Sequence, residues 1–107
     1  MIKGIGVDIV LISRFKEKQE KFAQFILTEK EYFLYKKSLD KLSFLAGRFA
    51  AKEALFKAFK GKYSLLDFEI LNAVSGEPIS NHGLISISHD GDYAIAYAIN
   101  TGGDNHE

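Results

Sequence analysis

The strongest constraint on the fold is the alternating stretch LISISHDGDYAIAYAIN at residues 84–100. Apolar residues recur at every second position on both sides of a polar run, which predicts two strands joined by a turn over residues 89–92. In the second strand the odd positions from Tyr93 to Ile99 are large, whereas the even positions from Ala94 to Ala98 are alanine. Because alternate side chains point to opposite faces, we expect a helix to pack against the alanine face.

Residues 2–10 are apolar and weakly alternating, so a strand that ends near Asp8 or Ile9 is expected ahead of three helices. Within this strand Gly4 and Gly6 indicate either a bulge or the close approach of another backbone. Ser13 is a candidate cap for a first helix over residues 14–25.

The next two helices have clearer boundaries. Thr28 and Glu31 have the capping-box spacing, which predicts a second helix over residues 29–37. A third and longest helix is expected to reach about Phe59 and to stop near Gly61. Its N-terminal cap has two candidates, Asp40 and Ser43.

After the third helix, residues 66–71 predict a strand, residues 72–78 a turn, and residues 101–107 a solvated tail. This order predicts an α+β fold in which a small, mostly antiparallel sheet packs against a long central helix and two shorter helices. We expect residues 1–107 to form a single domain. A sheet this small leaves one face or edge poorly covered, so we also expect a homo-oligomer.

The composition excludes several classes of protein. The 14 acidic residues balance the 14 Lys and Arg residues, so no net field attracts nucleic acid. The absence of cysteine excludes disulfides, thiolate zinc sites and cysteine nucleophiles. No apolar run approaches the roughly 20 residues that span a bilayer, and the N-terminus has no leader pattern. We therefore expect a cytoplasmic protein that does not contact a membrane.

The helix expected around residues 47–60 places Glu53 and Lys57 one turn apart among phenylalanines and alanines. An exposed salt bridge is one interpretation of such a pair. Asp8, at the end of the first strand, suggests another, because two converging carboxylates would need a cation. Proteins hold Mg²⁺ with one or two carboxylates together with waters and substrate phosphates. For Asp8 alone, the alternative is a turn or helix-start residue near Ser13.

Basic side chains also occur along the same helix. Arg48 and Lys52 lie one turn apart, and three more lysines lie near its end: Lys57, Lys60 and Lys62. They could clamp several phosphates, or they could form the solvated edge of a surface helix. His89, in the predicted turn, is either a structural group held by Asp90 or a donor to a phosphate oxygen.

The first predicted helix carries a basic stripe, Arg14, Lys18 and Lys21, beside an apolar stripe. An acidic protein partner could dock on these three residues. Solvated surface charge is the alternative interpretation.

Several motifs together resemble one family. They are GIGVDIV at residues 4–10, ILTEKE at 26–31, GRFAAKEALFKAF at 47–59, Gly76 with Pro78, and ISISHDGDYAIAYA at 85–98. In this order they are similar to the bacterial holo-acyl-carrier-protein synthases, which are small phosphopantetheinyl transferases. The likeness covers nearly the whole chain. It departs from the family at KAFKGK, where the family usually has a Gly-Thr-Gly-like loop.

The resemblance implies an enzyme of fatty acid and lipid metabolism that binds Mg²⁺ and coenzyme A. A serine hydroxyl of apo acyl carrier protein would attack the β-phosphate, take the phosphopantetheine arm and release 3′,5′-ADP. By this likeness Asp8 and Glu53 are metal ligands, with Glu53 or a metal-bound water as proton acceptor. Lys57 would neutralise the pyrophosphate. A non-catalytic oligomeric module that binds an acidic protein or a nucleotide is the second hypothesis.

The resemblance also assigns binding residues and an assembly. Arg48 and His89 resemble coenzyme A phosphate contacts, and Arg14 resembles a carrier-protein contact beside Lys18 and Lys21. The family forms homotrimers with active sites between subunits.

Overall fold

The alternating stretch forms the centre of the structure. β4 (His82–Asp90) and β5 (Tyr93–Asp104) make an antiparallel hairpin in which Asp90 lies opposite Tyr93. The turn is therefore shorter than predicted and consists of residues 91–92. β1 (Gly4–Leu11) pairs antiparallel with the other side of β5, which gives the order β1-β5-β4. The computed structural model describes residues 1–104, with side chains through residue 102.

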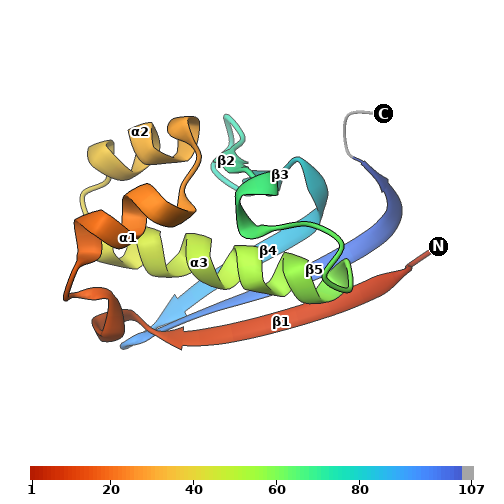
Figure 1. Cartoon of the computed structure of the whole chain (residues 1–107), viewed down its shortest axis with the longest axis horizontal. Coiled ribbons are helices and arrows are strands. Elements are labelled where there is room, and N and C mark those ends of the chain that lie inside the picture. The colour runs from red at the N-terminus through yellow and green to blue at the C-terminus, as the bar shows by residue number, and fades with distance from the viewer. Residues whose placement is uncertain (105–107) are drawn as a thin grey trace.

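The long helix α3 (Lys41–Ala58) lies across this sheet, as the alanine face predicts (Figure 1). Three alanines of β5 are at most 1% exposed beneath it, Ala94, Ala96 and Ala98. On the opposite face of the same strand, Tyr93, Ile95 and Tyr97 are 40–50% exposed. The predicted division of β5 into a small buried face and a large outer face is confirmed.

Two glycines of β1 allow its backbone to touch α3. A Cβ atom on Gly4 would lie 2.2 Å from the carbonyl oxygen of Ala58, and one on Gly6 would lie 2.0 Å from that of Ala54. These glycines therefore serve the close approach of two backbones rather than a bulge. Moving two residues forward along β1, from Gly4 to Gly6, moves the contact four residues backward along α3, from Ala58 to Ala54. β1 and α3 therefore run antiparallel (Figure 1).

The second and third helices begin and end close to their predicted limits. α2 is Glu29–Lys37, and both hydrogen bonds of the Thr28–Glu31 capping box are present. Asp40 caps α3 by accepting a hydrogen bond from the Ser43 amide, so Ser43 is not the cap. At the other end the Gly61 amide donates to the Phe56 carbonyl and closes the helix.

The predicted first helix is wrong over its first half. Instead of one helix over residues 14–25, there is a 3-10 helix (Ile12–Phe15), then Lys18 in a left-handed conformation, then α1 (Gln19–Ile26). The predicted cap, Ser13, instead binds the carboxylate of Asp92 through both its amide and its hydroxyl, at 3.1 and 2.6 Å. A long-range contact with the β4–β5 turn therefore replaces the local cap.

Two C-terminal predictions also need correction. Residues 66–71 form a 3-10 helix (Leu65–Asp67) followed by the short strand β2 (Ile70–Asn72), because Ser64 and Asp67 cap the 3-10 helix. β2 pairs antiparallel with β3 (Pro78–Ser80) across the predicted turn. The predicted tail is wrong at residues 101–104, which continue β5, and its remaining residues, 105–107, lie outside the described part.

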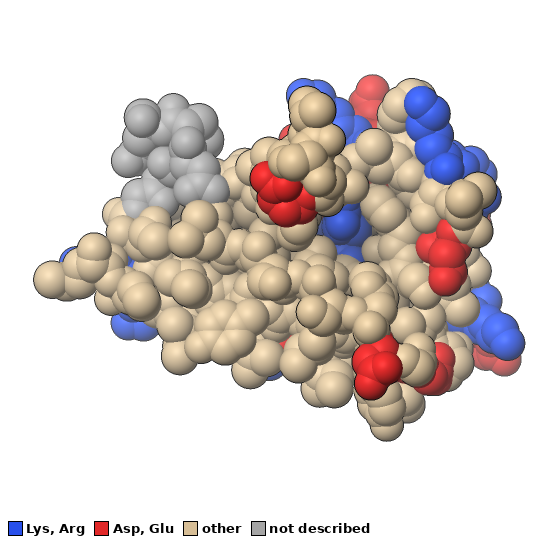
Figure 2. All heavy atoms as spheres, turned by 180° about the vertical axis from the view of Figure 1, so that it is seen from behind, with Lys and Arg blue, Asp and Glu red and all other residues tan. Residues whose placement is uncertain are grey.

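The outer face of the sheet is apolar and uncovered, as expected for so small a sheet. β1 and β5 expose seven large apolar side chains there: Ile5, Val7, Ile9, Leu11, Tyr93, Ile95 and Tyr97. Figure 2 shows a broad area with few charged groups on the side of the molecule opposite to the view of Figure 1. None of the helices in the described part is long and apolar enough to cross a membrane.

Candidate active site

Asp8 and Lys57 meet where β1 crosses α3. The Lys57 Nζ atom donates to the Val7 carbonyl oxygen at 2.8 Å and to Asp8 Oδ1 at 3.3 Å. Lys57 therefore pairs with a residue 49 positions away rather than with Glu53, so the simple salt bridge along the helix is not formed. Asp8 lies within β1, so its interpretation as a turn or helix-start residue is also wrong.

The second oxygen of Asp8 has no protein partner. Asp8 Oδ2 is buried, and it is the one buried side-chain polar atom in the described part of the chain without a hydrogen bond. Burying an unpaired carboxylate oxygen costs free energy, which a folded protein rarely accepts without a reason. The arrangement leaves this atom available to a cation or to an external hydrogen-bond donor.

Glu53 lies one helical turn before Lys57 and is half-buried. Gly6 of β1 lies against Ala54, the residue that follows Glu53, and Asp8 is the next residue of β1 on the same face of the strand. The described part of the chain contains no group of three or more His, Cys, Asp or Glu side chains that could hold a metal, so a cation here would depend on two carboxylates.

Arg48 is buried near the middle of α3 and is bound to neutral acceptors. Its Nε atom donates to the Ile70 carbonyl at 3.0 Å, its Nη2 atom to Asn72 Oδ1 at 2.7 Å, and the guanidinium covers the Phe44 ring at 4.3 Å. No carboxylate lies within ion-pair distance of Arg48 among the side chains that the structure describes. Burial lowers the pKa of Arg48, and the more distant charge of Glu31 opposes this shift.

Lys52 does not join Arg48 in a solvated phosphate clamp. It is fully buried and forms an ion pair with Glu31, at 2.7 Å between Nζ and Oε1. Burial lowers the pKa of Lys52, and the Glu31 carboxylate opposes this shift. Glu31 was predicted only as a member of the capping box, because the second contact of its carboxylate, with Lys52, has no local signal in the sequence.

His89 lies in strand β4, opposite Ala94, rather than in the turn. Its Nε2 atom is 3.1 Å from the Ser43 carbonyl oxygen, so it is not held by Asp90 as the sequence suggested. A Cβ atom on Gly47 would lie 3.0 Å from this nitrogen, which explains why glycine precedes Arg48. The histidine and Arg48 thus lie toward the N-terminal half of α3, whereas Glu53 and Lys57 lie toward its C-terminal half.

The three basic residues of the predicted stripe do not share one helix. Arg14 belongs to the 3-10 helix and stacks on Phe15 and Phe49, Lys18 precedes α1, and Lys21 lies within α1. Lys18 and Lys21 line a groove of about 490 Å³ together with three other residues, Phe22, Gln24 and Phe25. A basic rim around an apolar groove is therefore present, although the helical spacing that predicted it is wrong.

Comparison with known proteins identifies the family. Residues 4–98 match the model of the 4′-phosphopantetheinyl transferase superfamily. The chain belongs to this superfamily. It is 44% identical to the holo-[acyl-carrier-protein] synthase of Enterococcus faecalis, over 92% of this chain and 97% of the relative. The corresponding protein of Geobacillus sp. is 46% identical over 92% of this chain and 96% of the relative.

Solved structures of similar proteins match most of this chain. A holo-(acyl-carrier-protein) synthase from Bacillus anthracis, solved in complex with CoA (3′,5′-ADP), superposes with a TM-score of 0.86 at 39% identity. That match covers 94% of this chain and 96% of the other chain. The Helicobacter pylori synthase in complex with coenzyme A gives a TM-score of 0.75 at 33% identity, over 91% of this chain and 99% of that one.

Proposed function

We propose that this protein is a holo-acyl-carrier-protein synthase, which transfers the 4′-phosphopantetheine arm of coenzyme A to a serine hydroxyl of apo acyl carrier protein. The second product is 3′,5′-ADP. The relatives named above support this activity over almost their full length, and two structural relatives bind coenzyme A. The observation in this chain that carries the proposal is the orphaned Asp8 oxygen beside Lys57.

The acidic residues of this site fit Mg²⁺. Asp8 supplies a buried carboxylate oxygen that no protein group satisfies, and Glu53, beside the Ala54 that touches Gly6, supplies a second carboxylate. Hard oxygen ligands of this kind are what Mg²⁺ prefers, with waters and substrate phosphates completing its shell. When bound, Mg²⁺ would stabilise the negative charge of the pyrophosphate. We therefore infer that Asp8 and Glu53 hold the metal and that activity depends on it.

The transfer needs alignment and charge neutralisation more than a protein nucleophile. The serine oxygen of the carrier forms a bond to the β-phosphorus of coenzyme A as the bond from that phosphorus to the bridging oxygen breaks. Glu53 accepts the serine proton. The bridging oxygen leaves with its electron pair on 3′,5′-ADP, and Lys57 donates a hydrogen bond that stabilises the leaving phosphate. Asp8 keeps Lys57 oriented toward this position until the substrate binds.

Arg48 and His89 are assigned to the phosphates of coenzyme A. The buried guanidinium of Arg48 donates only to neutral acceptors, and a phosphate would supply the anionic partner that it lacks at ion-pair distance. His89 is exposed beside Ser43 and Gly47 in the half of α3 that also carries Arg48, where its ring can donate to a second phosphate oxygen.

The carrier protein is assigned to the basic rim formed by Arg14, Lys18 and Lys21. All three side chains are exposed, and the groove that Lys18 and Lys21 line includes Phe25, which is 74% exposed. A basic rim around an apolar centre suits an acidic carrier protein, since opposite charges steer the encounter and apolar contact holds the complex.

We also propose that the chain assembles as a homotrimer, with active sites shared between subunits. The apolar outer face of β1 and β5 supports an association between copies. The number three follows from the family resemblance. Light scattering coupled to size-exclusion chromatography measures it, and a monomer at micromolar concentration would contradict the assembly.

The activity is tested by incubating the protein with coenzyme A, Mg²⁺ and apo carrier protein, and then measuring the intact mass of the carrier. We expect the carrier to gain the mass of one phosphopantetheine. A carrier whose acceptor serine is replaced by alanine is the matched control, and a reaction with excess chelator tests the metal. A carrier of unchanged mass would reject the enzyme in favour of a binding module.

A further inference from the structure

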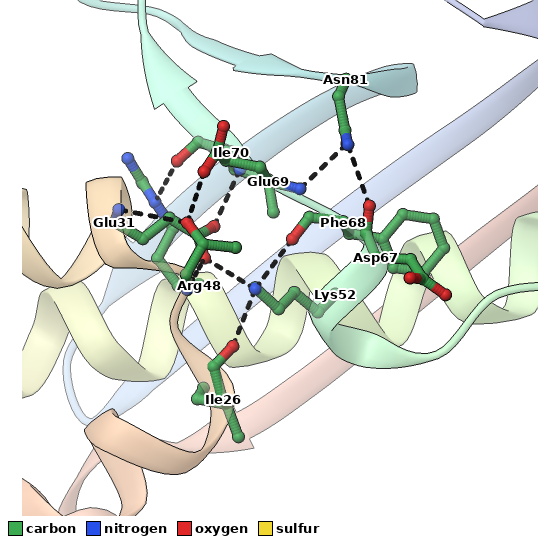
Figure 3. Close-up of polar contacts among 10 residues, drawn as sticks. Ile26, Glu31, Arg48, Lys52, Asp67, Phe68, Glu69, Ile70 and Asn81 are labelled. Carbon is green, nitrogen blue, oxygen red and sulfur yellow. Dashed lines mark hydrogen bonds and ion pairs between the residues drawn. The ribbon is translucent and has the colours of Figure 1, made fainter.

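A second, buried polar network surrounds the ion pair of Glu31 and Lys52. Both side chains are 0% exposed. The Lys52 ammonium has three donors and uses all of them, on Glu31 Oε1 at 2.7 Å, the Ile26 carbonyl at 2.8 Å and the Phe68 carbonyl at 2.9 Å. Figure 3 shows this amino group held between residues of separate segments. The pair therefore connects α2, α3, the end of α1 and the segment before β2.

The network occupies the free edge of β2. On one side of this strand, backbone groups pair toward β3, including the Glu69 carbonyl and the Ala73 amide. On the other side no strand of the described chain is hydrogen-bonded to β2, because its sheet has only two strands. The backbone groups of that edge are bound by charged side chains instead. Lys52 Nζ donates to the Phe68 carbonyl, and Glu31 Oε2 accepts a hydrogen bond from the Ile70 amide at 2.8 Å.

Arg48 also binds this edge of β2. Its Nε atom donates to the Ile70 carbonyl, so Glu31 binds the amide of Ile70 and Arg48 binds its carbonyl (Figure 3). Its Nη2 atom takes Asn72, two residues further along the same strand. The orientation of the guanidinium is therefore set by a strand whose own position is set by Glu31 and Lys52. Glu31 forms its ion pair with Lys52, and the charge of Glu69 also acts on Lys52, so Arg48 is left without a carboxylate at ion-pair distance.

We propose that Glu31 and Lys52 are positioning residues for coenzyme A binding, because they fix β2 and through it aim Arg48 at a phosphate of the substrate. The inference rests on the proposed function, since it takes Arg48 as a coenzyme A contact. Glu31 and Lys52 are fully buried, and each acts through the β2 backbone. They therefore affect substrate affinity and leave the chemical step at Asp8, Glu53 and Lys57 intact.

Kinetics of Glu31→Gln, with the full chain, separate positioning from chemistry. The amide of glutamine keeps the size of the side chain, but its N–H groups would face a donor, the Ile70 amide. The hydrogen bond that Glu31 accepts from Ile70 is therefore lost or weakened. We expect the KM for coenzyme A to rise about tenfold, while kcat and the KM for the carrier change less than about twofold. Glu29→Gln is the matched control, because Glu29 is an exposed carboxylate on the same helix. Glu31→Asp keeps the charge and shortens the reach, so it serves if the amide variant does not fold.

A double-mutant cycle tests whether the effect passes through Arg48. The dissociation constant of coenzyme A is measured by calorimetry for wild type, Glu31→Gln, Arg48→Ala and the double variant. If Glu31 acts through Arg48, its replacement adds little once Arg48 is gone, and the two effects are not additive. Additive effects, or a Glu31 variant with wild-type affinity, would overturn the inference and leave the proposed function standing. A wild-type protein that binds no coenzyme A would overturn both.

Discussion

Helix α3 carries two lysines five residues apart, and each meets a carboxylate from another part of the chain. Lys52 lies 2.7 Å from Glu31, and both side chains are 0% exposed. Lys57 lies 3.3 Å from Asp8, and these side chains are 51% and 18% exposed. In the first pair the lysine uses every donor and both carboxylate oxygens are bound. In the second pair, one carboxylate oxygen is buried and has no partner.

The difference separates a structural pair from a reactive one. A buried pair is tolerated when every donor and acceptor is satisfied, and it then holds segments together. A buried acceptor that stays unsatisfied is a cost to the folded state, and a ligand can recover that cost on binding. Burial alone would have pointed to Glu31 and Lys52 as the active site. Hydrogen-bond satisfaction points to Asp8 and Lys57 instead.

The largest effect is expected for Asp8→Asn. The amide removes the negative charge that a metal requires, so kcat/KM should fall about 10³-fold, which corresponds to about 4 kcal/mol of transition-state stabilisation. The free energy of unfolding should change by less than about 1 kcal/mol, because the pair with Lys57 is partly solvated. Transfer rates at saturating Mg²⁺ and urea unfolding measure the two quantities.

Glu77→Gln provides the control for Asp8→Asn, because Glu77 is an exposed carboxylate in the β2–β3 turn. It should keep wild-type activity. If Asp8→Asn keeps more than a tenth of the wild-type rate, the orphaned oxygen has no catalytic purpose and the comparison of the two pairs fails.

The second effect concerns stability. Lys52→Met leaves the Glu31 carboxylate buried without its cation, so the free energy of unfolding should fall by about 3–5 kcal/mol. Lys57→Met, on the same helix, should cost less than about 1 kcal/mol. Urea unfolding at one fixed protein concentration compares them, since association also stabilises the fold. Equal losses in the two variants would show that the pairs are not different in kind.

A double replacement, Glu31→Leu with Lys52→Met, sharpens the same point. Apolar replacement of a buried ion pair is often neutral, because it removes two desolvated charges. Here it would also strip partners from four backbone groups, the amides of Thr28 and Ile70 and the carbonyls of Ile26 and Phe68. We expect a loss of about 2–4 kcal/mol by urea unfolding. A variant as stable as wild type would mean that the hydrogen bonds of Glu31 and Lys52 to the edge of β2 do not stabilise the fold as a neighbouring strand would.

The sequence predicted those parts of the fold that depend on local pattern. The alanine face of β5 and the Thr28–Glu31 capping box were predicted and are confirmed, and of the two alternatives for Gly4 and Gly6 the structure has the close approach. Each feature follows from a pattern among nearby residues: alternation in β5, glycines without side chains in β1, and a fixed spacing in the capping box. The family motifs are local in the same sense, so the resemblance was also visible.

The sequence could not predict contacts between distant segments. Lys57 has Glu53 one turn away, yet it pairs with Asp8, because β1 crosses α3 at that point. Glu31 showed its local role in the capping box but not its bonds to Lys52 and Ile70. Ser13 was predicted to cap the first helix, but α1 begins at Gln19, and Ser13 instead binds Asp92, 79 residues further along the chain. In each case a tertiary partner competes with a plausible local one.

The smallest effect that distinguishes the pairs is on metal affinity. In the absence of coenzyme A, the Lys57 ammonium is an internal counter-charge for Asp8, so a metal must compete with it. Lys57→Met should therefore raise the affinity for Mg²⁺ by about fivefold, which corresponds to about 1 kcal/mol for one charge in a partly solvated site. Calorimetric titration with Mg²⁺ alone measures this change, and Lys62→Met controls for the loss of an exposed charge nearby. Weaker or unchanged binding in Lys57→Met would mean that Lys57 does not shield Asp8. The pair would then be an ordinary surface contact, and the orphaned oxygen would be the only remaining sign of a metal site.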